Sequence, residues 1–70
     1  MSKLYSSRHI IKVLAKQGFV FISQKGSHLK YRKHGIVILT VIIPANKKEI
    51  PYGTFRSILR QSLLREEDFK

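Results

Sequence analysis

The sequence predicts an α+β fold with its elements in the order α-β-β-β-α. Two segments with apolar residues at helical spacing flank three segments rich in β-forming residues, and short turns connect those three. Short turns join antiparallel neighbours, so we expect a three-stranded antiparallel sheet with the second strand in the centre. Two helices on one face of this sheet would enclose one core, and 70 residues suffice for a single small domain, residues 1–70.

The first helix is expected to begin near Arg8, because a serine hydroxyl at Ser6 or Ser7 can cap it. Gly18 suits the left-handed residue that follows a helix. Apolar residues recur between these limits at the spacing of one helix face, namely Ile10, Ile11, Leu14 and Ala15.

Three strands follow the first helix. The turns between them contain Gly26 and Gly35, and Pro44 ends the third strand. The strands are expected at residues 19–23, 28–32 and 36–43, the last of which runs from Ile36 to Ile43.

The second helix is expected to open at Gly53, with Thr54 as its N-cap, after a basic loop over residues 45–52. Residues 65–70 form either a last short turn or a frayed end. The apolar stripe of this helix consists of Phe55, Ile58, Leu59, Ser62 and Leu63.

The charge of the chain points to a polyanionic partner. Lysine and arginine number 14 against four acidic residues, which gives a net charge of +10. Residues 1–65 contain 13 basic side chains and only one acidic side chain, Glu49, so this stretch carries +12. A field of this sign attracts nucleic acid, although a solubilising surface charge is the alternative.

Several classes of protein are disfavoured by composition. Without cysteine there are no disulfides, thiolate metal sites or cysteine nucleophiles, and the spacing of the three histidines matches no metal-binding pair. We therefore expect no metal and no cofactor. The longest apolar run has eight residues, whereas a membrane-spanning helix needs about 20, and no secretory signal is visible. We expect a cytoplasmic protein that has no membrane partner.

The second strand carries the most informative pattern. Its alternation sends Leu29 and Tyr31 to one face, where they should pack under the helices. The other face then presents His28, Lys30 and Arg32 as a solvent-exposed row.

A histidine among cations suits one particular reaction. Lys25 reaches toward the same region from the preceding turn, and positive neighbours favour the neutral imidazole of His28. Cations bind a phosphodiester and stabilise the charge that develops on it. We therefore expect that His28 takes the proton of an RNA 2′-hydroxyl, which attacks the adjacent phosphorus without a metal. An ordinary surface histidine is the alternative.

The other candidates are weaker. His9 and His34 are interpreted as a helix-surface residue and a turn residue. Ser27 either binds a phosphate or shapes the turn. Four more cations either line the RNA path or form a solvated surface, namely Lys47, Lys48, Arg56 and Arg60.

In layout the predicted fold resembles a double-stranded RNA-binding domain. Over residues 6–64 the sequence also resembles the HicA family of mRNA interferase toxins. The resemblance rests on Gly18-Phe19-Val20, Gln24-Lys25-Gly26-Ser27-His28, Tyr31-Arg32 and the run from Gly53-Thr54-Phe55-Arg56 to Ser57-Ile58-Leu59-Arg60-Gln61.

The resemblance implies metal-independent cleavage of mRNA, inhibition of translation and neutralisation by a HicB-type antitoxin protein. It places the catalytic histidine on His28 and the turn glycine on Gly26. Two features depart from the family pattern. Ala45 and Asn46 stand where relatives often carry a second histidine, so either Lys25, Lys30 or water protonates the leaving oxygen or this step goes unassisted. The run Ser62-Leu63-Leu64 replaces a small residue and glycine.

The third strand, Ile36 to Ile43, is apolar on both faces except at Thr40, yet it lies at an edge of the predicted sheet. An uncovered apolar edge invites association, so we expect a protein contact there unless the C-terminal segment covers it. Two competing functions remain at this point, a non-catalytic module that binds structured RNA and a pure protein adaptor.

Overall fold

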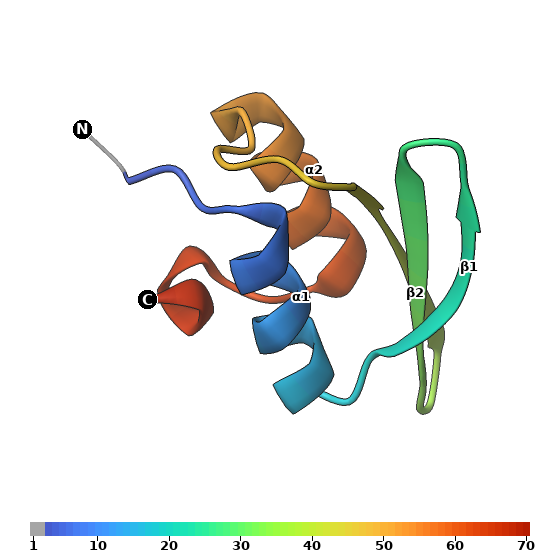
Figure 1. Cartoon of the computed structure of the whole chain (residues 1–70). Helices are drawn as coiled ribbons and strands as arrows, with labels where there is room; N and C mark the ends of the chain where they lie inside the picture. Colours follow the sequence, from blue (N-terminus) through green and yellow to red (C-terminus); the bar gives the residue numbers. More distant parts are fainter. Residues whose placement is uncertain (1–2) are drawn as a thin grey trace.

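The computed structural model describes residues 3–70 and confirms the predicted α+β class (Figure 1). The strands form one antiparallel sheet in the order β1-β2-β3, and both helices lie on the same side of it. The elements are α1 (Ser7–Lys16), β1 (Val20–Lys25), β2 (His28–His34), β3 (Ile38–Pro44), α2 (Tyr52–Ser62) and the 3₁₀ helix η1 (Glu66–Phe69).

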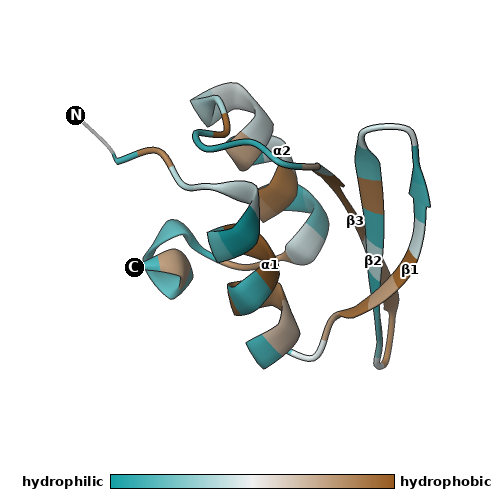
Figure 2. Cartoon of the chain, in the orientation of Figure 1, coloured by the Kyte–Doolittle hydropathy of each residue, from teal (hydrophilic) through white to brown (hydrophobic). Residues whose placement is uncertain are grey.

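The core lies between the helices and β3. Figure 2 shows β3 as a hydrophobic strand beside the helices. Its residues Val41 and Ile43 are fully buried, because both helices contact this strand. Among residues 3–70, the other buried apolar side chains lie on α1, α2, η1 and two loops, and none lies on β1 or β2. They are Ile10, Leu14, Phe19, Ile50, Phe55, Ile58 and Phe69.

The β1–β2 hairpin extends beyond the helices (Figure 1). Every residue of β1 is exposed. Leu29 and Tyr31 of β2 are therefore only half-buried, and the prediction that they pack under the helices is too strong. Tyr31 still packs against the core, and Phe21 meets its ring edge-on at a centroid distance of 5.7 Å. The hairpin thus contributes little to the core.

Several element boundaries differ from the prediction. β1 runs to Lys25 and β2 to His34, so both are strand residues and their assignment to turns is wrong. β2 and β3 pair from His34 and Ile38, so Ile36 lies in the turn, fully exposed, and not in the strand. The second helix begins at Tyr52 after Pro51, whose fixed φ of −56° fits the entry to a helix. Thr54 is consequently a residue of its first turn and not the N-cap.

The C-terminal segment is ordered against α1, which settles the two alternatives for residues 65–70. Phe69 is fully buried, and His9 Nε2 lies 2.5 Å from its carbonyl oxygen. Tyr5 stacks on the His9 ring at 4.8 Å. His9 is therefore a structural residue.

The second helix also contacts the C-terminal segment. Tyr52 donates to Glu66 at 3.1 Å, and this carboxylate raises the pKa of the Tyr52 phenol through the hydrogen bond and its charge.

Neither α1 nor α2 approaches the length and apolarity that a bilayer crossing requires, and within residues 3–70 no other helix does either.

Ile58→Ala should lower the free energy of unfolding by about 2–5 kcal/mol, because it leaves a cavity in the core where Ile58 is fully buried. The matched control is Ile36→Ala, which removes the same atoms from a fully exposed site and should change that free energy by less than about 0.5 kcal/mol. Urea denaturation measures both. Equal effects of the two variants would contradict the core described above.

Candidate functional site

His28 is the first residue of β2 and is exposed on the face of the sheet that points away from the helices. Residues paired across neighbouring strands share a face, and His28 pairs with Lys25 of β1. Lys30 lies two residues further along β2, on the same face. The three side chains line one shallow hollow of about 230 Å³ together with Ser23 and Ile42.

The turn before His28 is built by Gly26. Its φ of +59° lies in the left-handed region, and a Cβ there would meet no atom within 4 Å, so the glycine is needed for its backbone and not for space. Gln24 Nε2 donates to the Gly26 carbonyl at 3.0 Å. The Ser27 carbonyl accepts a hydrogen bond from the Ala45 amide at 2.7 Å. The turn is therefore fastened to the loop that follows β3.

The buried Ser7 in turn fastens this loop to α1. Its hydroxyl donates to the Pro44 carbonyl at 2.6 Å and accepts from the Lys47 amide at 3.0 Å. The Ser7 amide also donates to the Lys47 carbonyl at 2.9 Å. The helix cap itself is Ser6, which accepts from the His9 amide. From the sequence the two serines are alternative caps, and the role of Ser7 is not predicted because its partners lie 37 and 40 residues away. The sequence does hold one clue, because a helix needs only one N-cap and the second serine is then available for another role.

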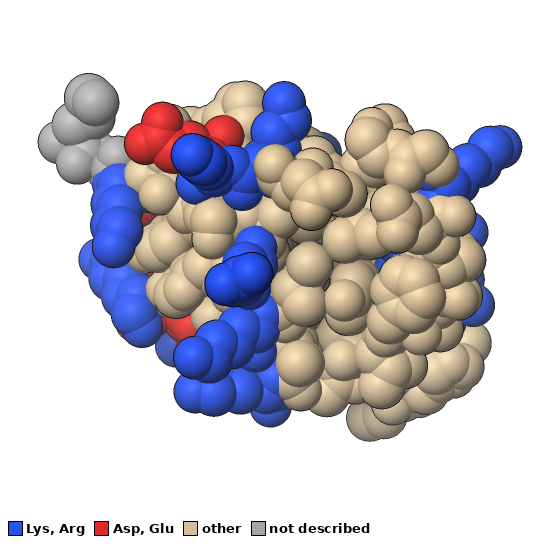
Figure 3. All heavy atoms as spheres, in the orientation of Figure 1, with Lys and Arg blue, Asp and Glu red and all other residues tan. Residues whose placement is uncertain are grey.

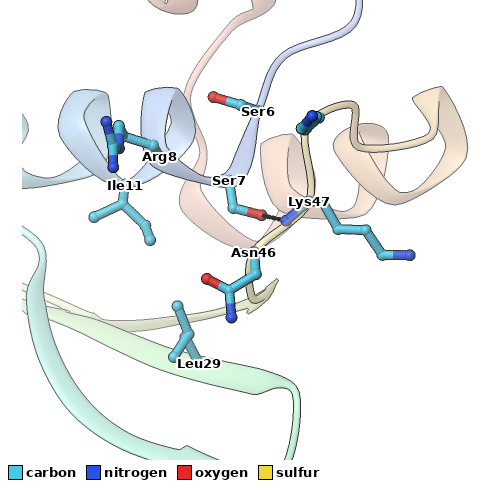
Figure 4. Close-up of a pocket in the computed structure, with 8 residues that line it drawn as sticks. Ser6, Ser7, Arg8, Ile11, Leu29, Asn46 and Lys47 are labelled. Atoms are coloured by element: carbon cyan, nitrogen blue, oxygen red, sulfur yellow. Dashed lines mark hydrogen bonds between the residues drawn. The ribbon is translucent and has the colours of Figure 1, made fainter.

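A second, larger hollow of about 670 Å³ opens between the start of α1, β2 and this loop (Figure 4). The predicted RNA-contacting residues Lys47 and Lys48 line it, and so does Arg8, which the sequence marks only as a helix start. Leu29 lines both hollows. The two hollows lie on opposite faces of the sheet, because Leu29 faces α1 whereas His28 and Lys30 point away from the helices.

Other predicted contact residues lie apart from His28. Arg32 points toward β3, where its Nε donates to Thr40 Oγ1 at 3.1 Å. Arg56 and Arg60 are exposed on α2 and line neither hollow, and Arg60 donates to Ser57 at 3.3 Å. The structure thus groups Lys25, Ser27 and Lys30 with His28 but places the two α2 arginines elsewhere.

The remaining histidines lie away from this site. His34 is the last residue of β2 and pairs with Ile38, at the opposite end of the strand from His28. His9 is engaged with Phe69. Among residues 3–70, no three histidine, aspartate or glutamate side chains come together as a metal site would require.

The outer edge of β3 is covered in part. Gln61 Oε1 of α2 accepts a hydrogen bond from the Ile42 amide at 3.0 Å. Val41 and Ile43 are buried, whereas Val37 and Ile38 are about 60% exposed and Ile36 is fully exposed. The expected apolar surface of residues 36–43 is therefore most exposed at the turn and the first residues of β3. Ile42 is half-buried on the outward face and lines the hollow of His28.

Ser7→Ala should lower the free energy of unfolding by about 1–3 kcal/mol, because the Lys47 amide and the Pro44 carbonyl would lose their partner. Thermal denaturation measures the effect. Ser57→Ala is the control, since its hydroxyl makes only two long, exposed contacts, with the Gly53 carbonyl at 3.4 Å and with Arg60 at 3.3 Å. A loss no greater than that of the control would show that Ser7 does not hold the loop.

Comparison with known proteins identifies the family. No curated protein sequence matches the chain closely enough to count as a relative. The family described as the HicA toxin of bacterial toxin-antitoxin matches residues 7–64, which is well over half of the chain and includes every element from α1 to α2. The chain therefore belongs to the HicA family of toxins from bacterial toxin–antitoxin systems.

Proposed function

We propose that this toxin is an endoribonuclease that cleaves mRNA in the cytoplasm without a metal and so inhibits translation. The observation that carries the proposal is the exposed imidazole of His28 in one hollow with Lys25 and Lys30. This arrangement supplies a proton acceptor and two cations at a surface open to a polyanion. Membership of the HicA toxin family supports the same conclusion.

The reaction needs only groups of this chain and of the RNA. His28 removes the proton of a ribose 2′-hydroxyl, and the 2′-oxygen attacks the adjacent phosphorus. The bond from phosphorus to the 5′-oxygen of the next nucleotide breaks, which leaves a 2′,3′-cyclic phosphate on one product. Lys25, Lys30 or water returns a proton to the departing oxygen. The lysines also stabilise the charge that builds on the phosphoryl oxygens. DNA lacks the internal nucleophile and is not cut.

The remaining contacts hold the RNA along this surface. Gly26 and Ser27 bring the turn close to the scissile phosphate, and Arg32 extends the cationic row along β2. Lys47 and Lys48 contact the RNA from the loop after β3, on the other face of the sheet. The two arginines of α2, Arg56 and Arg60, contact RNA that extends beyond the hollows.

A toxin of this family has an antitoxin partner. We propose a HicB-type antitoxin that contacts the exposed apolar residues at the start of β3, where Ile36, Val37 and Ile38 lie. Such a partner would cover a surface that is otherwise prone to association.

A second candidate function is a module that binds structured RNA and cuts nothing. The observation in its favour is the missing second histidine, because Ala45 and Asn46 follow Pro44 and the other two imidazoles are remote from His28. Without an acid of suitable strength, departure of the 5′-oxygen is harder.

His28→Ala should reduce cleavage of RNA by about 10²- to 10⁴-fold in the presence of EDTA, because the general base is lost. RNA affinity should change little. The control is His34→Ala, which removes the exposed histidine at the other end of β2 and should leave cleavage intact. Cleavage of labelled RNA on denaturing gels measures both variants. If the wild-type protein leaves RNA whole at every salt concentration and pH tried, the non-catalytic module is correct.

The double substitution Lys30→Glu and Arg32→Glu should abolish RNA association, because it replaces two cations of the open face by acids. The control is Lys12→Glu with Lys16→Glu, the same charge change on exposed positions of α1. Filter binding at low salt gives the affinity. Unchanged RNA association of the first variant would indicate a protein adaptor.

A further inference from the structure

We propose that the 670 Å³ hollow between α1, β2 and the loop after β3 is a subsite for one unpaired nucleotide of the RNA, and we call it the nucleotide groove. This inference rests on the proposed function. It adds where one nucleotide of the RNA binds and that this nucleotide is unpaired. The groove is lined by Arg8, Ile11, Leu29, Asn46, Lys47 and Lys48, with the serines at the start of α1. Its volume falls in the usual range for sites that take small organic molecules, about 300–1,000 Å³.

The charge of the groove suits phosphate groups. Three of its lining residues are cations and none is acidic. Arg8 lies in the first turn of α1, where the helix dipole disfavours a positive charge, and this turn holds no acidic residue. The sequence therefore places a cation at an unfavourable position, which is understandable if Arg8 binds an anion.

The floor of the groove suits a nucleobase. Figure 4 shows the side chains of Ile11 and Asn46 directed toward Leu29. Ile11 and Leu29 are half-buried and offer an apolar surface to the face of a base. The Asn46 amide carries both a donor and an acceptor, which can read the edge of a base. Asn46 has a φ of +57°, a strained backbone that directs this amide and that persists most often at functional sites.

The apolar floor continues along the hairpin. Tyr31 shares a face of β2 with Leu29, and Phe21 of β1 pairs with Tyr31. The Phe21 ring is 54% exposed and stands edge-on to Tyr31. Figure 3 shows an uncharged surface over this side of the hairpin, beside groups of lysine and arginine side chains. Exposed aromatic rings stack on the faces of unpaired bases.

The strand state follows from these surfaces. A duplex presents its backbone and base edges and keeps its base faces stacked inside, so it has nothing to place on Leu29, Tyr31 or Phe21. An unpaired strand is flexible enough to lay one base in the groove. To reach His28 as well, it must pass around the end of the sheet where the Ser27 carbonyl meets the Ala45 amide, because the two hollows lie on opposite faces.

The test uses the full chain with His28→Ala, which prevents cleavage of the probe. Fluorescence anisotropy compares a short labelled single-stranded RNA with the blunt duplex of the same sequence. The single strand should bind at least about 10-fold more tightly. Asn46→Gly keeps the left-handed backbone and removes the amide, so single-strand affinity should fall roughly 5- to 100-fold. The affinities of the Asn46→Gly variant for poly(A), poly(C), poly(G) and poly(U) should also differ less from one another than those of the parent protein.

A matched pair of substitutions on α1 separates binding from folding. Arg8→Gln should weaken single-strand binding about 5-fold or more and leave the melting temperature unchanged or higher, because an unfavourable charge is removed from the first turn. Lys16→Gln removes a favourable charge from the last turn and should do the opposite, with slightly lower stability and nearly unchanged binding.

The outcomes distinguish the two proposals. Absence of RNA binding by wild type and by His28→Ala overturns the proposed function. Single-strand binding that is unaffected by Asn46→Gly and Arg8→Gln overturns the nucleotide groove and leaves the proposed function standing. Equal affinity of the protein for duplex and single strand also overturns the nucleotide groove. The same holds if Asn46→Gly and Arg8→Gln weaken antitoxin binding but not RNA binding. The nucleotide groove is supported if Asn46→Gly and Arg8→Gln both lower single-strand affinity and Asn46→Gly also reduces the differences among the homopolymers.

Discussion

One buried hydroxyl group determines how the functional surface is assembled. Ser7 lies in the first turn of α1, and its hydrogen bonds connect this turn to the end of β3 and to the basic loop that follows. The loop is in turn bonded to the carbonyl of Ser27, next to His28. Two separate hollows are thereby held at a fixed distance, although they belong to segments far apart in the sequence. Hydrogen bonds between the Ser7 hydroxyl and the backbone therefore connect the segments that form the site.

The residues that form the core and those of the proposed reaction lie in different parts of the molecule. Its core gathers between the helices and β3, and the strand farthest from the helices, β1, buries none of its residues. Side chains of β1 are consequently free of core packing, and those on the outward face of β2 lie outside the core, so both can be cationic or titratable. The cost is a small core, which an 8.2 kDa chain can hardly enlarge. The ordered C-terminal turn adds to it through Phe69.

Periodicity accounts for what could be predicted from the sequence. The apolar spacing from Ile10 to Leu14 and the alternation from His28 to Arg32 fix the order of elements and the outward face of β2. Resemblance to a toxin family directs attention to His28 and agrees with the family match. Its chemical role remains a prediction.

Long-range contacts account for what could not be predicted. Nothing local indicates that Ser7 meets Pro44, 37 residues away, or that the helices cover β3 and leave β1 bare. The groove between α1 and β2 likewise depends on how the loop returns to the helix, so Arg8 has no sequence signal as a contact residue. Pro51 overrides Thr54 as the helix entry because its fixed φ already fits that position.

The hydrogen bond from the Ile42 amide to Gln61 restricts how the sheet can grow. Amides on one edge of a strand belong to alternate residues, so those of Ile38 and Thr40 point outward in the same direction as that of Ile42. Any extended peptide that adds a fourth strand to this sheet finds the third of these donors already occupied by α2. It must align with the first half of β3 and turn away before reaching Ile42. The register of such an addition is therefore decided by a glutamine on a helix and not by the strand itself.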